Sequence, residues 1–230
     1  MTTLRVDIWS DIACPWCYIG KRRLEQALAS FPHAADVAIA WRAFELDPGA
    51  PKSPDPQPMA ERLAKKYRID VKAAEAQLAR VAAIAAQDGL ELRFDRMRPG
   101  NTFDAHRLLH FAGDHQSALK ERLFRAYMTD GQSVADRDVL AACARDAGLD
   151  EAAARELLAG DQLTDEVRGD EALAHELGIT GVPFFVLGGR LAISGAQPVD
   201  VLRGALDQAW ASAESGPIAD GAACGPDGCD

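Results

Sequence analysis

Strand-like patterns occur only near the two ends of this 230-residue chain, and a long run of helical patterns separates them. The strand patterns alternate apolar and polar residues or form short apolar runs, whereas the helix patterns repeat every three to four residues. In chain order these end segments are a strand at 4–9, a helix at 21–31, strands at 37–41, 183–187 and 190–194, and a helix at 199–211. Either end alone has too few strands for a sheet, so together they predict one α/β domain.

The middle of the chain reads as helical. Residues 47–58 contain five prolines, which prevent regular hydrogen-bonded structure and mark a connection out of the first β-α-β unit. Helical patterns then follow one another at 59–68, 71–88, 102–113, 117–129, 136–147, 151–159 and 162–177. The predicted fold is α/β, with β-α-β at the start, β-β-α at the end and a large all-helical insertion between them.

These patterns also predict the domain boundaries. Residues 1–46 and 179–211 form the α/β domain, and residues 47–178 form the inserted helical domain. Residues 212–230 are rich in Ala, Gly, Asp and Ser and are expected to be a flexible tail that contains Cys-x4-Cys.

Charge and hydropathy narrow the range of partners. The net charge of −10 repels phosphate backbones and anionic lipids, so nucleic acid and membranes are not expected as partners. Asp7 interrupts the apolar run that a secretory signal would need, and the expected location is the cytoplasm. Since thiols are kept reduced there, the five cysteines are expected to be catalytic, metal-binding or incidental.

The run Cys14-Pro15-Trp16-Cys17 follows the first strand directly. If Pro15 opens a helix, Cys14 is its N-cap, and its sulfur faces free backbone N–H groups at the positive end of the helix dipole. Both effects lower the pKa of the thiol, which makes Cys14 the expected nucleophile and Cys17 the expected resolving thiol. The alternative, half of a zinc site, requires two more ligands, while a position between strand and helix favours a thioredoxin-like redox motif.

A second candidate is Thr180-Gly181-Val182-Pro183, immediately before an apolar strand. Proline cannot donate a hydrogen bond to a sheet, so a strand that begins with it is an edge or a functional site. A rigid turn leading into the strand remains the alternative interpretation.

Three motifs together resemble a known family. They are Cys14-Pro15-Trp16-Cys17-Tyr18-Ile19-Gly20, Asn101-Thr102 with Ala105-His106-Arg107, and Gly181-Val182-Pro183. Over about residues 1–211 the chain resembles the DsbA-like thioredoxin superfamily, and within it the cytoplasmic FrnE-like branch. The resemblance implies a thioredoxin-like fold with a cis Pro183 beside the cysteine pair and a helical block that caps the catalytic face.

The resemblance also implies a protein disulfide oxidoreductase that acts on protein or peptide thiols and disulfides. Pro15, Trp16, Val182 and Pro183 would contact the substrate, and the Val182 backbone would pair with it as an added strand does. No organic cofactor is expected, although glutathione is a candidate co-substrate, and the protein would be a monomer or homodimer. Secreted oxidants of this type often have His between the cysteines, so Pro15-Trp16 favours a milder reductase or isomerase.

Two other functions fit the same scaffold. The 2-hydroxychromene-2-carboxylate isomerases and kappa-class glutathione transferases use bound glutathione and typically have Ser at the position of Cys14. A non-catalytic chaperone or peptide-binding module would use the groove over Pro183 without thiol chemistry.

The tail carries a further pair, Cys224 and Cys229, around a Pro-Asp-Gly turn. A flexible linker of this length reaches on the order of 20 Å, so the hypothesis is that the tail pair exchanges electrons with Cys14 and Cys17. Incidental cysteines and metal binding are the alternatives.

Five more residues have competing interpretations. His106 and His110 have metal-ligand spacing, but no acidic residue completes the usual His-Glu-x-x-His arrangement, so a packed or capping role is favoured. Cys143 lies among small residues and is expected to be buried and inert. Asp11 and Glu45 are candidates for proton transfer, with solvated surface carboxylates as the favoured interpretation.

Overall fold

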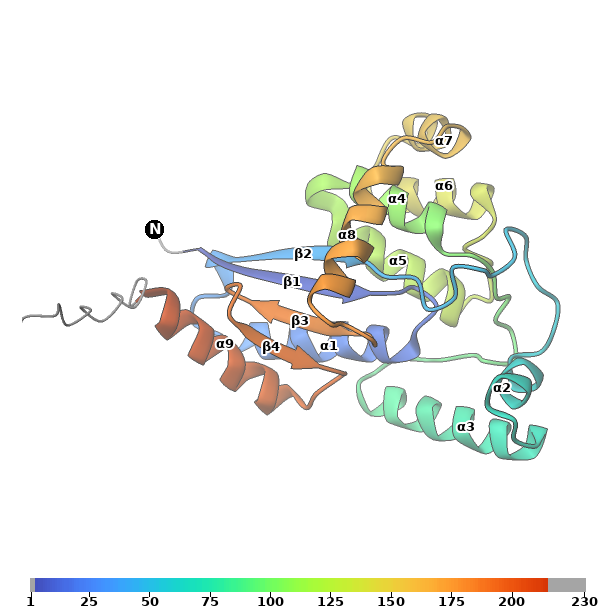
Figure 1. Ribbon diagram of the computed structural model, residues 1–230, viewed down its shortest axis with the longest axis horizontal. Helices are drawn as coiled ribbons and strands as arrows, with labels where there is room; N and C mark the ends of the chain where they lie inside the picture. Colours follow the sequence, from blue (N-terminus) through green and yellow to red (C-terminus); the bar gives the residue numbers. More distant parts are fainter. Residues whose placement is uncertain (1–2, 215–230) are drawn as a thin grey trace, which may run out of the picture.

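The structure is a computed structural model that describes residues 3–214. It contains a four-stranded mixed sheet in the order β2-β1-β3-β4 (Figure 1). β1 pairs in parallel with β2 and antiparallel with β3, and β3 pairs antiparallel with β4. The strands are β1 (Leu4–Ser10), β2 (Val37–Ala43), β3 (Phe184–Leu187) and β4 (Leu191–Ser194).

The described helices follow the predicted order. Two of them, α1 (Pro15–Ala29) and α9 (Val199–Glu214), belong to the α/β unit. The insertion consists of α2 (Met59–Tyr67), α3 (Val71–Gln87), α4 (Phe103–Phe111), α5 (Gln116–Met128), α6 (Arg137–Asp146), α7 (Glu151–Ala159) and α8 (Thr164–Glu176). The thioredoxin-like fold with a helical insertion is therefore confirmed, with boundaries within a few residues of those expected.

One boundary differs clearly. The apolar spacing predicted a helix at 21–31, but α1 begins at Pro15 and ends at Ala29. Its first turn is stabilised by Pro at the N-terminal position, which periodicity alone does not detect. Phe31 lies beyond the helix and is buried beside Trp210 of α9, so its apolar character serves tertiary packing.

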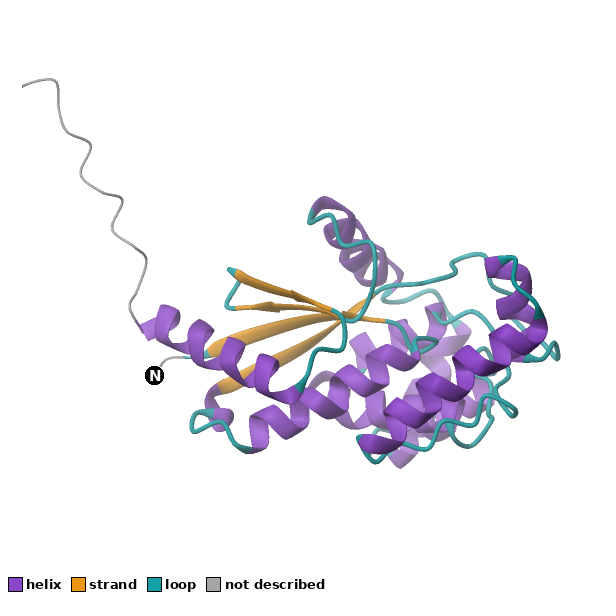
Figure 2. Ribbon diagram, turned by 90° about the horizontal axis from the view of Figure 1, so that it is seen from below, coloured by secondary structure: helices purple, strands orange, loops and turns teal. Residues whose placement is uncertain are grey.

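Helices lie on both sides of the sheet (Figures 1 and 2). On one side α1 and α9 pack side by side, and their apolar residues share a core with Ile8 of β1 and Phe185 of β3. On the other side Ala174 of α8 packs against Trp9. The second core, within the insertion, also includes Cys14 and Cys17, so the cysteine pair lies where the insertion meets the α/β unit.

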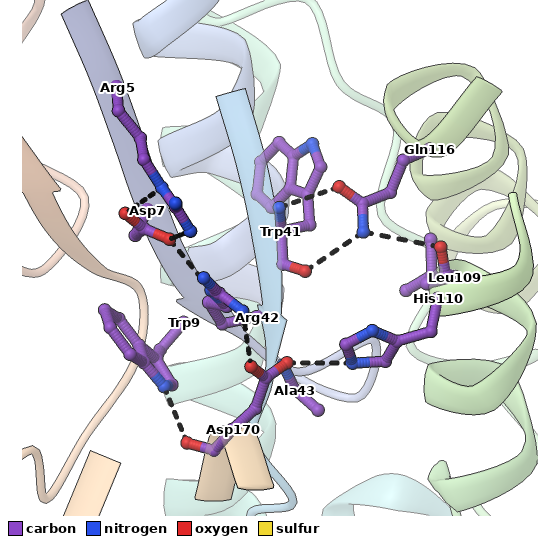
Figure 3. Close-up of polar contacts among 10 residues, drawn as sticks. All are labelled: Arg5, Asp7, Trp9, Trp41, Arg42, Ala43, Leu109, His110, Gln116 and Asp170. Atoms are coloured by element: carbon purple, nitrogen blue, oxygen red, sulfur yellow. Dashed lines mark hydrogen bonds and ion pairs between the residues drawn. The ribbon is translucent and has the colours of Figure 1, made fainter. Parts of the chain in front are cut away.

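The insertion covers part of the free edge of β2, at Trp41. The side chain of Gln116, at the start of α5, accepts from the N–H of Trp41 at 2.8 Å and donates to the carbonyl of the same residue at 3.1 Å (Figure 3). A primary amide thus replaces the next strand and satisfies backbone groups that an edge would leave unpaired.

Asp170 of α8 anchors the insertion to the sheet (Figure 3). Its buried carboxylate accepts from Arg42 at 2.9 Å and from the N–H of Ala43 at 2.9 Å, and it pairs with His110 of α4 at 2.9 Å. Burial alone raises the pKa of Asp170, but the bonds from His110 and Ala43 and the charge of Arg42 outweigh it and leave the pKa below its usual value.

Candidate functional site

Cys14 lies at the N-cap of α1, between the end of β1 and the first helical turn. Its N–H donates to the carbonyl of Asp11 at 3.2 Å, which closes the turn that brings the thiol to the helix start. A hydrogen bond from the Cys17 thiol lowers the pKa of Cys14, and the backbone N–H groups of Cys17 and Trp16 lower it further. These effects exceed the opposing effect of burial, so this environment favours the thiolate.

Cys17 lies one turn further along α1 and is completely buried. Burial raises the pKa of its thiol well above the ordinary value, and the hydrogen bond to Cys14 raises it further. Cys14 and Cys17 are both free thiols in this structure. Two adjacent sulfurs with opposite pKa shifts suit a nucleophile and a resolving thiol.

The segment before β3 completes the site. The peptide bond between Val182 and Pro183 is cis, as the resemblance implied. The Cys14 thiol donates to the carbonyl of Val182 at 3.5 Å, so residues 168 positions apart in the chain meet here. Gly20 allows this approach, because a Cβ atom there would lie 2.9 Å from Cγ of Pro183.

The rim of the site is partly apolar. Trp16 is 39% exposed beside the buried cysteines, and Leu46 is 40% exposed on the loop that follows β2. The N–H of Leu46 donates to Asp11 at 2.8 Å, which fixes this loop next to the N-terminus of α1. Exposed apolar side chains beside a polar backbone group are suited to an extended peptide.

Asp11 is buried directly behind the cysteine turn, so the interpretation of it as a solvated surface carboxylate is wrong. Besides Leu46, it accepts from the N–H of Ala13 at 3.2 Å. His106 of α4 brings Nε2 within 3.5 Å of its Oδ1. Burial raises the pKa of Asp11, but the interactions with His106, Leu46 and Thr102 outweigh it and leave the pKa lowered.

Glu45 is also buried, which contradicts the same interpretation. It accepts from Nδ2 of Asn101 at 3.0 Å and faces Arg168 at 2.7 Å. The proline-rich segment folds back over it, since the N–H of Asn101 donates to the carbonyl of Pro51 at 2.8 Å. The sequence did not reveal this burial because the covering residues are more than fifty positions away or lie in a loop.

Sequence reasoning missed Lys120 of α5. Its side chain is completely buried, and Nζ donates to the carbonyl of Ser10 at 3.4 Å. A signal was present, because Lys120 shares one helix face with the buried Leu123, Phe124 and Tyr127 at helical spacing. A charged residue on an otherwise apolar helix face is expected to be buried, and a buried charge needs a partner.

The remaining candidates in the described part of the chain are not in contact with Val182 or Pro183. His110 pairs with Asp170, and among residues 3–214 no three His, Cys, Asp or Glu side chains group as metal ligands. Cys143 is completely buried in α6, and burial raises the pKa of its thiol to about 11, as expected for an inert cysteine. Cys224 and Cys229 lie outside the described residues.

Residues 5–207 match the model of the DSBA-like thioredoxin domain. The chain belongs to this family. A crystal structure of a probable DsbA oxidoreductase from Streptomyces coelicolor is 47% identical, covers 99% of this chain and 98% of its own, and superimposes with a TM-score of 0.87. The uncharacterized protein YwbO of Bacillus subtilis is 31% identical over 212 residues, which are 89% of this chain and 96% of YwbO.

The DsbA-like fold is also found in an isomerase. The structure of a 2-hydroxychromene-2-carboxylate isomerase is 17% identical, covers 92% of this chain and 98% of its own, and has a TM-score of 0.65. At this identity the likeness shows the fold alone, so function has to be argued from the site. Within residues 3–214, no helix is both long and apolar enough to cross a bilayer.

Proposed function

We propose that this DsbA-like protein is a thiol–disulfide oxidoreductase that acts on protein or peptide substrates. The observation that carries the proposal is the placement of two free thiols in the first turn of α1, with Cys14 against the carbonyl of Val182 before cis Pro183. Their surroundings lower the pKa of Cys14 and raise that of Cys17. Only a thiolate attacks a disulfide, and the resolving thiol must stay protonated until the mixed disulfide exists.

In the reductive direction the Cys14 thiolate attacks one sulfur of a substrate disulfide. That S–S bond breaks, a mixed disulfide forms, and the first substrate sulfur leaves as a thiolate that takes up a proton. Cys17 then loses its proton and attacks the sulfur of Cys14, which releases the second substrate thiolate. The substrate gains two electrons and two protons, and the Cys14–Cys17 pair is left as a disulfide.

The substrate is proposed to lie along Val182 and Pro183 in extended form, with Trp16 and Pro15 contacting its side chains. The half-exposed indole and the Val182 carbonyl support this placement. Glutathione is the candidate co-substrate that restores the starting redox state, and no organic cofactor takes part in the exchange.

The Cys17→Ser variant is expected to accumulate a mixed disulfide between Cys14 and a disulfide-containing peptide, because the resolving thiol is missing. Non-reducing electrophoresis and mass spectrometry of the adduct measure this. The matched control is Cys143→Ala, which removes a thiol that burial keeps protonated and should turn over without a trapped adduct. A Cys17→Ser protein that never forms an adduct would contradict the assignment of the two roles.

Two variants separate this function from the alternatives. Glutathione-dependent isomerisation of 2-hydroxychromene-2-carboxylate that survives Cys14→Ser would favour the isomerase. Protection of a client from aggregation that persists in the Cys14→Ser, Cys17→Ser double variant, without any exchange activity in the wild type, would favour a chaperone. The two cysteines support the oxidoreductase over both.

Several finer assignments belong to the same proposal. We place the protein in the FrnE-like branch and in the cytoplasm, as a monomer or homodimer. The Pro15-Trp16 dipeptide favours a reductase or isomerase, and a reduction potential near that of cytosolic glutathione would support this direction. A much more oxidising value would instead indicate disulfide donation.

The tail relay through Cys224 and Cys229 stays a prediction, because both residues lie outside the described part of the chain. α9 lies beside α1 and Arg203 bonds the carbonyl of Ser30, so α9 ends beyond the end of α1 that is farther from Cys14. α1, with 15 residues, spans about 22 Å, so the described part of the chain ends far from Cys14. We therefore expect the relay to operate between molecules as well as within one.

Mixing a Cys224→Ser, Cys229→Ser protein with a Cys14→Ser, Cys17→Ser protein tests this relay. Restored turnover that rises with concentration is expected. If the tail variant alone turned over at the wild-type rate, with the redox state of Cys14 unchanged, the relay would be wrong.

A further inference from the structure

A buried lysine of the insertion lies behind the cysteine turn. Lys120 Nζ is 3.4 Å from the carbonyl of Ser10, which is the long end of hydrogen-bond distances. It also lies over two rings, 5.2 Å from the centroid of Phe124 and 5.4 Å from that of Trp41. One long hydrogen bond and two aromatic faces stabilise the charge of an ammonium group far less than water does.

A fully buried cation needs an anion nearby. Asp11 is one, held in place by the N–H groups of Ala13 and Leu46, and its charge attracts the ammonium. The sulfurs of Cys17 and Cys14 attract it as well. Phe124, under the ammonium, stacks at 4.9 Å on Tyr18, which directly follows Cys17 in α1, so the amine lies close to the first turn of that helix.

We propose that Lys120 is the counter-charge of the reduced cysteine pair, a positioning residue that acts through Cys17 and Cys14. The helical insertion thereby supplies part of the redox centre in addition to covering it. This inference rests on the proposed function, since it assumes that the pair cycles between dithiol and disulfide.

The coupling follows from charge balance. A substrate dithiol that reduces the Cys14–Cys17 disulfide gives up two electrons and two protons and becomes a disulfide. The electrons break the S–S bond and leave Cys14 as a thiolate and Cys17 as a thiol. One proton goes to Cys17, and the other is taken up by any unprotonated Lys120 amine or released to solvent, so the ammonium charge of Lys120 faces the new thiolate.

Two other basic residues lie near Lys120, but neither can supply the positive charge that faces the cysteine pair. Burial lowers the pKa of Lys120 to about 8, against the attraction of Cys17, Asp11 and Cys14. Lys21 of α1 is already neutralised by ion pairs with Glu25 and Glu121 at 2.5 and 2.6 Å. Burial, together with the charge of Lys120, lowers the pKa of His106 of α4, which disfavours a positive charge on this imidazole.

The test is the equilibrium of the Cys14–Cys17 pair with glutathione at pH 7 in the Lys120→Met variant, whose side chain has similar length. We expect the equilibrium constant for reduction to fall about tenfold, which is a potential about 30 mV more negative, because the thiolate loses its counter-charge. The pKa of Cys14, followed by alkylation, should rise in the same variant. The matched control is Lys65→Met, which removes the same charge from an exposed position in α2.

An equilibrium constant and a Cys14 pKa in Lys120→Met that match those of Lys65→Met would overturn the inference. If the methionine variant does not fold, the pKa of the Lys120 amine in the wild type, read by NMR, is expected to rise on reduction, and an unchanged value overturns the inference equally. Failure of the proposed function gives a different result: the wild type would not reduce insulin, while these titrations would still report on Lys120.

Discussion

Replacing Cys14 with Ser lowers the rate of insulin reduction by at least about a thousandfold, because a serine hydroxyl stays protonated at neutral pH and cannot attack a disulfide. The structure gives the reason why this position is so sensitive. Cys14 is the thiol whose pKa is lowered by Cys17 and by the N–H groups that open α1, whereas burial raises the pKa of Cys17. Turbidity of precipitating insulin B chain, with dithiothreitol or glutathione as reductant, measures the rate.

The control for this experiment is Cys143→Ala. It removes the third described cysteine, which lies in the core of the insertion, and should keep turnover within about twofold of wild type once the folded fraction is equal. Retention of more than about a tenth of the activity by the Cys14→Ser protein would contradict the mechanism. Loss of activity in both variants would point to the fold instead of the thiol.

The Asp170→Ala variant is expected to lose about 3 kcal/mol or more of its free energy of unfolding. The substitution removes the carboxylate that Arg42, His110 and the N–H of Ala43 share, and it leaves these groups partly buried without their partner (Figure 3). Urea denaturation followed by circular dichroism gives the difference. The matched control is Asp165→Ala, an exposed carboxylate of the same helix that should change stability by less than about 1 kcal/mol.

The same carboxylate predicts an acid dependence of stability. The pKa of Asp170 is lower in the folded protein than in the unfolded chain, so its contribution is fully present above about pH 4, the unfolded value. That contribution disappears as the pH falls through the lower folded value. The stability difference between wild type and Asp170→Ala should therefore shrink below pH 4, and a difference that stays constant down to pH 2 would contradict this account.

Local patterns in the sequence were sufficient for the order of the elements and for the first half of the site. Helices of the insertion repeat apolar residues at helical spacing, and Pro15 after a strand marks the start of α1 with Cys14 at its cap. For the second half, Val182 and Pro183, local patterns did not distinguish a rigid turn from a functional site. The contact between Val182 and Cys14 depends on how β3 pairs with β1, which no local pattern encodes.

The buried charges behind the site were the main gap. Asp11 resembles a polar loop residue in the sequence, and it is buried because Leu46 and His106 close over it from distant segments. Lys120 looks like an ordinary surface lysine between Leu119 and Glu121 until the face it shares with Phe124 is considered. Burial of a charge depends on tertiary packing, so sequence periodicity identifies such a residue only when it interrupts an apolar face.

The pKa of the Cys14 thiol tests the central claim most directly. It is obtained from the pH dependence of alkylation by iodoacetamide in the reduced protein, with the modified Cys14 peptide quantified by mass spectrometry. The account predicts a midpoint clearly below the ordinary thiol value of about 8.5. A midpoint at or above 8.5 would contradict it.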